Sequence, residues 1–170
     1  MSLLDSILNN PQIISQVAAR FGIDPAEATA AIQKIVPALA GGLHAQLSSQ
    51  GAQADAVKAM VEDGTHQQMV ENPSAITEHN ADAGHAILSH LLGSHDVKAE
   101  LAQKVAQETG VNADTLKQMM PTLAAVVMGA ASKQLASHGS TESFIGSISH
   151  YAGEGTLVGG LLNMIKQKIA

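Results

Sequence analysis

The chain has 170 residues, 45% hydrophobic and only 2% aromatic, and it carries 15 acidic side chains against 9 basic ones. This length can bury one core without disulfides, and the absence of cysteine excludes disulfides, thiolate metal ligands and cysteine nucleophiles. The net charge of −6 disfavours an extended contact with nucleic acid, so we expect one soluble cytoplasmic domain over residues 1–170.

The N-terminal segment predicts a short amphipathic helix with three apolar side chains, Leu3, Leu4 and Ile7. It has no basic residue before this stretch and contains Asp5, unlike a secretory signal. The longest nearly uninterrupted apolar run in the chain, residues 123–131, is about half of the roughly 20 residues that cross a bilayer. We therefore expect a folded N-terminal helix and no membrane span.

Capping residues place two more helices between residues 11 and 50. The first begins at Pro11 and ends at Gly22, and the second begins at Pro25. Pro37 lies inside the second and cannot donate to the preceding turn, so we expect a kink or a restart there. Residues 35–54 contain no Asp, Glu, Lys or Arg, which predicts a central helix.

Residues 101–129 repeat this pattern at an offset of 88 residues before the glycine and 84 after it. The matching positions are Leu101, Val105, Gly110, Val111, Pro121 and Leu123 against Ile13, Val17, Gly22, Ile23, Pro37 and Leu39. The difference of four residues is about one helical turn, which preserves the inward face. The sequence therefore predicts an all-α multihelical bundle with an internal duplication. Its helix-Gly-helix-Pro-helix units span about 11–50 and 96–137, and their two central helices pack through Ala and Gly.

The remaining segments also predict helices. Two short helices are expected over 52–63 and 64–72, and another from Ala81 to Gly93. Residues 138–155 are rich in Gly and Ser, and we expect them to be the most mobile. The last helix, about 156–169, carries an apolar row formed by Leu157, Leu161 and Ile165.

Three stretches of the chain, 84–97, 109–112 and 119–129, resemble a bacterial family known as domain of unknown function 937, DUF937. The run from Phe21 to Glu27 and the segment 37–40 are similar to the opening of that family. YidB-like proteins share the helical character more distantly. The resemblance implies a bacterial, all-helical domain, and it implies no activity, cofactor or catalytic residue.

Two site hypotheses compete with a role in protein interaction. Residues 17–33 have the order of a helix-turn-helix, although the second helix offers a DNA groove only Gln33 and Lys34. Glu78, Asp82 and His85 fall on one helical face and suggest a metal site, although His85, His90 and His95 are spaced by five and diverge. Met119, Met120 and Met128 favour core filling over an adaptable groove.

No nucleophile, base and orienting group occur at a convincing spacing, so we expect no catalytic residue, no bound metal and no cofactor. The sequence favours a non-enzymatic protein-protein interaction module, with homo-oligomerisation or binding to another protein through two terminal apolar faces. Those faces are formed by Leu3, Leu4 and Ile7 and by Leu157, Leu161 and Ile165. The alternatives are that both helices cap their own bundle, that residues 17–33 bind DNA, or that His and carboxylate residues bind a metal.

Overall fold

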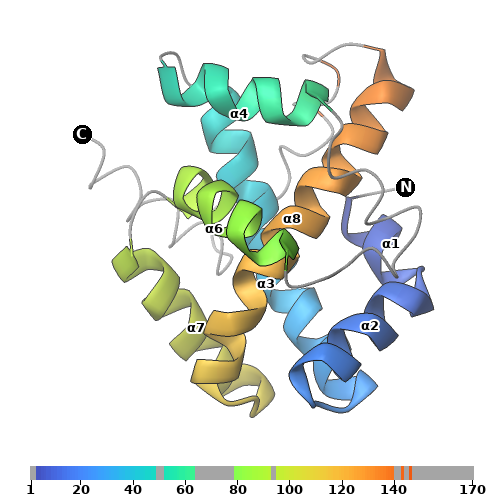
Figure 1. Ribbon diagram of the computed structural model, residues 1–170, viewed down its shortest axis with the longest axis vertical. Helices are drawn as coiled ribbons and strands as arrows, with labels where there is room; N and C mark the ends of the chain where they lie inside the picture. The colour runs from blue at the N-terminus through green and yellow to red at the C-terminus, as the bar shows by residue number, and fades with distance from the viewer. Residues whose placement is uncertain are drawn as a thin grey trace.

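A computed structural model of the protein describes residues 3–48, 52–63, 79–92, 95–139, 143 and 146. Seven α-helices and no strand occur in these ranges, which confirms the predicted all-α fold (Figure 1). The helices are α1 (Leu3–Leu8), α2 (Pro11–Phe21), α3 (Pro25–Ser48), α4 (Ala52–Asp63), α6 (His79–Leu92), α7 (His95–Thr109) and α8 (Ala113–His138). The helices expected over 64–72 and 156–169 and most of 138–155 lie outside the described residues.

Local capping explains where α2 and α8 begin. The Asn10 side chain accepts a hydrogen bond from the Gln12 backbone N–H at 3.1 Å, and the Asn112 side chain accepts one from the Asp114 N–H at 2.8 Å. In each case a side-chain oxygen satisfies a backbone donor that has no partner inside the helix. The start of α2, which the sequence predicted at Pro11, is therefore set by short-range chemistry, and so is the start of α8.

Left-handed glycines end α2 and α7. Gly22 has φ 66° and its N–H donates to the Ala18 carbonyl, while Gly110 has φ 79° and donates to the Ala106 carbonyl at 2.8 Å. Side chains with a Cβ rarely adopt this conformation. The two glycines that the sequence alignment paired thus perform the same structural task.

The prolines do not divide the long helices. Both α3 and α8 continue through their internal prolines, Pro37 and Pro121, so the restart considered from the sequence does not occur. A proline inside a helix costs about 3 kcal/mol because it removes a hydrogen bond and crowds the preceding turn. Tertiary packing offsets this cost, since both helices are buried on several sides.

Helices α3 and α8 form the centre of the bundle. Each of them contacts all six other described helices, and residues 119–132 of α8 are buried without interruption. The closest glycine contacts described, however, join α6 to both of them. A Cβ at Gly42 would lie 2.5 Å from the Leu91 carbonyl oxygen, and a Cβ at Gly84 would overlap the carbonyl oxygen of Pro121. Small residues therefore admit α6 as a third central element.

Within the described ranges, no helix combines the length and the apolar character needed to cross a membrane.

Candidate interaction surface

The helix-turn-helix-like segment is formed by the end of α2, the Gly22 turn and the start of α3. Lys34 and Gln33 are exposed, but Lys34 Nζ lies 3.3 Å from Glu108 Oε2 of α7. Asp24 and Glu27 lie near the start of α3 and would face phosphates with negative charge. The only Lys or Arg of α3 is thus held by a carboxylate, which opposes the contacts that DNA binding requires.

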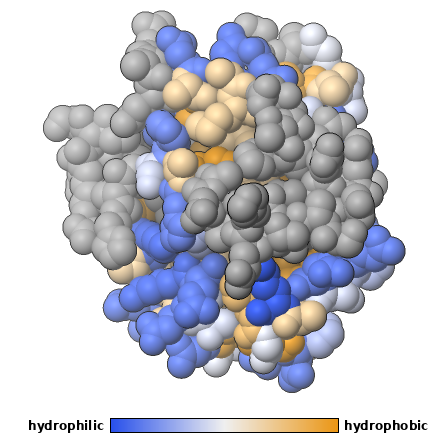
Figure 2. Space-filling view, in the orientation of Figure 1, coloured by the Kyte–Doolittle hydropathy of each residue, from blue (hydrophilic) through white to orange (hydrophobic). Residues whose placement is uncertain are grey.

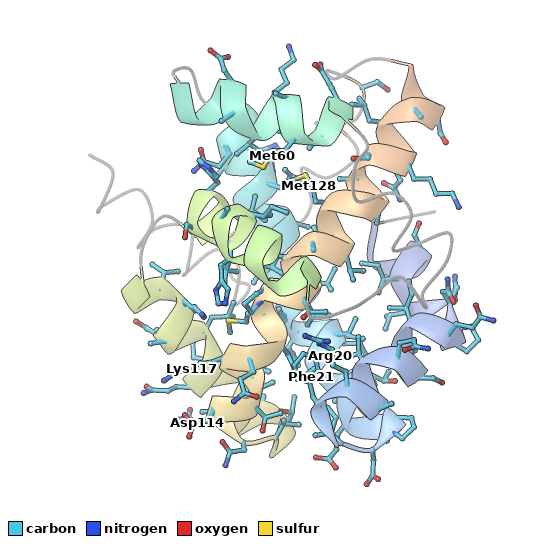
Figure 3. The ribbon with its side chains drawn as sticks, viewed as in Figure 1. Arg20, Phe21, Met60, Asp114, Lys117 and Met128 are labelled. Carbon is cyan, nitrogen blue, oxygen red and sulfur yellow. The ribbon has the colours of Figure 1, made fainter. Side chains whose placement is uncertain are left out.

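Arg20, the other cation of this segment, is directed at its own helix. Its guanidinium carbon lies 5.5 Å from the centroid of the Phe21 ring, and its Nε is buried without a hydrogen-bond partner (Figure 3). The side chain therefore contributes a cation–π contact to the turn between α2 and α3.

The residues of the metal hypothesis are not brought together in the described part of the chain. His85 is exposed and His90 is half-buried on α6, while Glu78 and the side chain of Asp82 are outside what the structure describes. Among the described residues, no group of three or more His, Cys, Asp or Glu side chains could hold a metal ion.

The methionines of α8 belong to the core. Met119, Met120 and Met128 have no exposed surface. Figure 3 shows Met128 where α8 meets α4, the helix that carries Met60. The interpretation as core filling is confirmed, and these thioethers do not line an exposed groove.

Ile7 is also a core residue. Its side chain is fully buried where α1 packs on α3 and α8, and Gln134 of α8 donates a hydrogen bond to the Ser6 hydroxyl at 3.1 Å. A side chain with no exposed surface in the protomer cannot form part of a contact surface, so Ile7 is removed from the candidate surface. The burial of Ile7 agrees with the alternative that α1 caps its own bundle. The side chains of Leu3 and Leu4 are outside the described set.

The pairing of α1 with α6 was missed by sequence analysis. At an offset of 84 residues, four fewer than the 88 that relate α2 to α7, the apolar pairs Leu3 and Leu4 and Ile7 and Leu8 match a second set, Ile87, Leu88, Leu91 and Leu92. Helix α1 contacts α2, α3 and α8, and α6 contacts α7, α8 and α3, so their neighbours correspond. This correspondence favours the predicted duplication, which stays a prediction, and extends it before residue 11. The repeated apolar pairs were the signal that could have revealed it.

One apolar patch on the face that Figure 2 presents lies over α4. Pale orange residues gather over α4, where Ala59 is exposed and Ala56 and Met60 are half-buried. Exposed charged side chains of the same helix, Asp55, Lys58 and Glu62, interrupt this surface. Single apolar side chains between charged ones are normal on a protein surface.

Lys98 of α7 lies near a second lysine on α8. Partial burial, and after it the positive charge of Lys117 on α8, lowers the pKa of Lys98 on α7. Both causes disfavour the protonated amine in the folded state. Half-buried lysines without a further feature do not make a binding site for an anion.

The predicted C-terminal row therefore remains the candidate surface. Leu157, Leu161 and Ile165 lie outside the described residues, whose main run ends at Gly139 with φ 78° and its N–H bonded to the Leu135 carbonyl at 3.1 Å. The family model described as "Bacterial protein of unknown function (DUF937)" matches residues 4–134. The chain belongs to the DUF937 family. The DUF937 match contains all seven described helices except for the ends of α1 and α8, and the C-terminal row lies beyond it. No curated protein and no solved structure matches the chain.

Proposed function

We propose that this chain is a non-enzymatic, cytoplasmic interaction module that self-associates through the C-terminal row of Leu157, Leu161 and Ile165. The observation that carries the proposal is the position of this row beyond the DUF937 match, which ends at residue 134. The described apolar core runs from Ile7 to Ala131, includes large side chains of α7 and α8 such as Leu101 and Leu123, and falls within the family match. We infer that a second molecule, rather than this core, contacts the row.

The composition of the row supports the same function. Residues 156–169 place Leu157, Leu161 and Ile165 at intervals of four. Lys166 falls on another side of such a helix, whereas Lys168, seven residues after Leu161, lies at the edge of the C-terminal row on the same face. Burying a large aliphatic side chain contributes about 1.5 to 3 kcal/mol, so three of them suffice for a reversible contact. Exposed apolar faces of this kind commonly mark sites of protein association.

Replacing Leu161 and Ile165 by Glu tests this function. We expect wild-type protein to form a dimer or larger species in light scattering, and the double variant to be monomeric with unchanged helical circular dichroism. Loss of two buried side chains should weaken association by at least about 100-fold. The matched control replaces Asn163 and Gln167 by Glu, which adds the same charge on the opposite side of the predicted helix.

The outcomes distinguish a row that contacts a second molecule from a row that caps its own bundle. A control that also becomes monomeric would assign the effect to charge and overturn the proposal. So would a wild-type protein that is monomeric at high concentration, or a Glu variant that loses its helical fold.

A further inference from the structure

Two lysines at the contact between α7 and α8 lack a carboxylate partner among the described residues. Lys98 of α7 and Lys117 of α8 are both half-buried, and Lys117 lies in the part of α8 that is beside α7 (Figure 3). By contrast, Lys104 of α7 has its Nζ 3.5 Å from Glu100 Oε1. Neither Lys98 nor Lys117 has a described carboxylate at such a distance. The amines of the pair are therefore close to one another without a compensating negative charge.

The position of Lys98 in its helix acts in the same direction. Helix α7 begins at His95, so Lys98 lies in the first turn. Backbone N–H groups without partners give this end of a helix a partial positive charge, and a cation is favoured at the opposite end. Helix position, partial burial and the second amine thus all disfavour the ammonium form of Lys98. Consistent with this, partial burial and, after it, the charge of Lys117 lower the pKa of Lys98.

The other charged groups around α7 leave this effect in place. The described titratable side chains on the helices that contact α7 are Glu27, Lys34 and His44 of α3, His85 and His90 of α6, and Asp114, Lys117 and Lys133 of α8. Among them, Lys117 is the one whose charge acts on Lys98. Within α7, Glu100 is paired with Lys104, and Asp96 occupies a position about 200° around the helix from Lys98.

We propose that Lys98 is a site of acylation, at which the neutral amine attacks the carbonyl carbon of an acyl phosphate. An amide C–N bond forms, the C–O bond to the phosphate breaks, the phosphate leaves with that electron pair, and the amine proton passes to solvent. An amine beside another cationic group is an activated nucleophile, because more of it is unprotonated at neutral pH. This inference concerns α7 and α8 alone and does not depend on self-association.

Charge selects the class of acyl donor. An acyl phosphate is an anion, so the ammonium group of Lys117 attracts its phosphoryl group toward Lys98, although most of the chain repels it at a net charge of −6. Conversion of Lys98 to a neutral amide also removes the repulsion between two neighbouring ammonium groups. Both terms favour the product at this lysine over the product at a lysine that is paired with a carboxylate.

Acetyl phosphate is the probe that tests this site. Full-length folded protein is incubated with it, and samples are taken at intervals and unfolded. The remaining amines are then labelled with deuterated acetic anhydride, so that the ratio of light to heavy acetyl groups in peptide mass spectrometry gives the rate at each lysine. Lys58 of α4 and Lys133 of α8 are internal references, because both are exposed.

We expect Lys98 to be acetylated severalfold faster than either reference, although Lys98 is less exposed, and to lose this advantage in guanidinium chloride. Lys117→Gln should slow the reaction of Lys98, whereas Lys117→Arg should preserve it because the positive charge remains. The matched control is Lys133→Gln, which removes the same charge from an exposed position near the other end of α8 and should leave the rate at Lys98 unchanged. Circular dichroism verifies the fold of each variant.

Two results would overturn the proposal. One is a rate at Lys98 no faster than the rate at Lys58 in the folded protein. The other is a preference for Lys98 that persists after unfolding, since it would then arise from the local sequence and not from the contact of α7 with α8. An unchanged rate at Lys98 in Lys117→Gln would overturn the role of the second amine.

Discussion

Thr122 is a polar residue in the apolar core. Its side chain is fully buried in α8, next to Pro121, and its hydroxyl has no hydrogen-bond partner. The corresponding residue of α3 is Ala38, which has no polar side-chain atom. An unpaired buried hydroxyl costs about 1 to 3 kcal/mol in proteins, so this position destabilises the fold.

Replacing Thr122 by Val should therefore raise the free energy of unfolding by about 1 kcal/mol, since Val has nearly the same shape and no hydroxyl. Urea denaturation measures the change. The control is Thr29→Val, because the Thr29 hydroxyl donates to the Pro25 carbonyl at 2.8 Å in an exposed turn and its loss should not stabilise the protein. A destabilised Thr122→Val protein would mean that the hydroxyl has a partner, such as a buried water molecule.

At the scale of elements, α6 depends on positions without a side chain. Gly84 lets the backbones of α6 and α8 meet at Pro121, and Gly42 lets α3 approach Leu91. The α-hydrogen of Gly84 points toward the Pro121 carbonyl oxygen, a geometry that recurs as a weak hydrogen bond between close helices. Helix α1, which the predicted duplication pairs with α6, has six residues against fourteen.

Gly84→Ala should force α6 and α8 apart and cost roughly 1 to 3 kcal/mol, the range seen for overpacked cores. Thermal or urea unfolding measures this loss. The informative comparison is Gly110→Ala, where a Cβ would meet nothing within 4 Å and the cost arises only from the left-handed backbone at φ 79°. Gly84→Ala alone should also loosen the packing of α6. Amide hydrogen exchange would detect this as lower protection of the α6 backbone amides. Unchanged stability of Gly84→Ala would contradict this close approach.

At the scale of the whole molecule, charge opposes the DNA-binding alternative. The net charge is −6, and the helix-turn-helix-like segment has Lys34 paired with Glu108 and Arg20 stacked on Phe21. Affinity for duplex DNA depends on cations that reach phosphates, and it falls steeply with added salt. The two cations of this segment thus lie against groups of the protein itself, Lys34 beside Glu108 of α7 and Arg20 beside Phe21.

We expect no retention of the protein on duplex DNA, even at low ionic strength where phosphate contacts are strongest. A gel-shift series across salt concentrations measures this, with Glu108→Gln as the informative variant because it releases Lys34. Tight binding by the wild-type protein that weakens with salt would restore the DNA-binding hypothesis.

The sequence by itself determined the local structure of the described chain. Asn10, Gly22, Gly110 and Asn112 act through their own backbone neighbours, so their capping tasks could be predicted without a fold. The charge-free stretch of α3 and the apolar run of α8 likewise predicted two central helices, because a helix without a polar face must be buried.

Only the tertiary structure decided which apolar faces the bundle itself uses. Leu and Ile rows at Ile7 and at Leu161 have the same character in sequence, and burial of Ile7 depends on the packing of α1 against α3 and α8. The continuity of α3 and α8 through proline was also beyond sequence reasoning, because neighbouring helices supply the free energy that offsets the lost hydrogen bond. The insertion of α6 at Gly42 and Gly84 was decided in the same way. A glycine in the sequence shows that another backbone can approach closely. Only the fold determines which backbone does so.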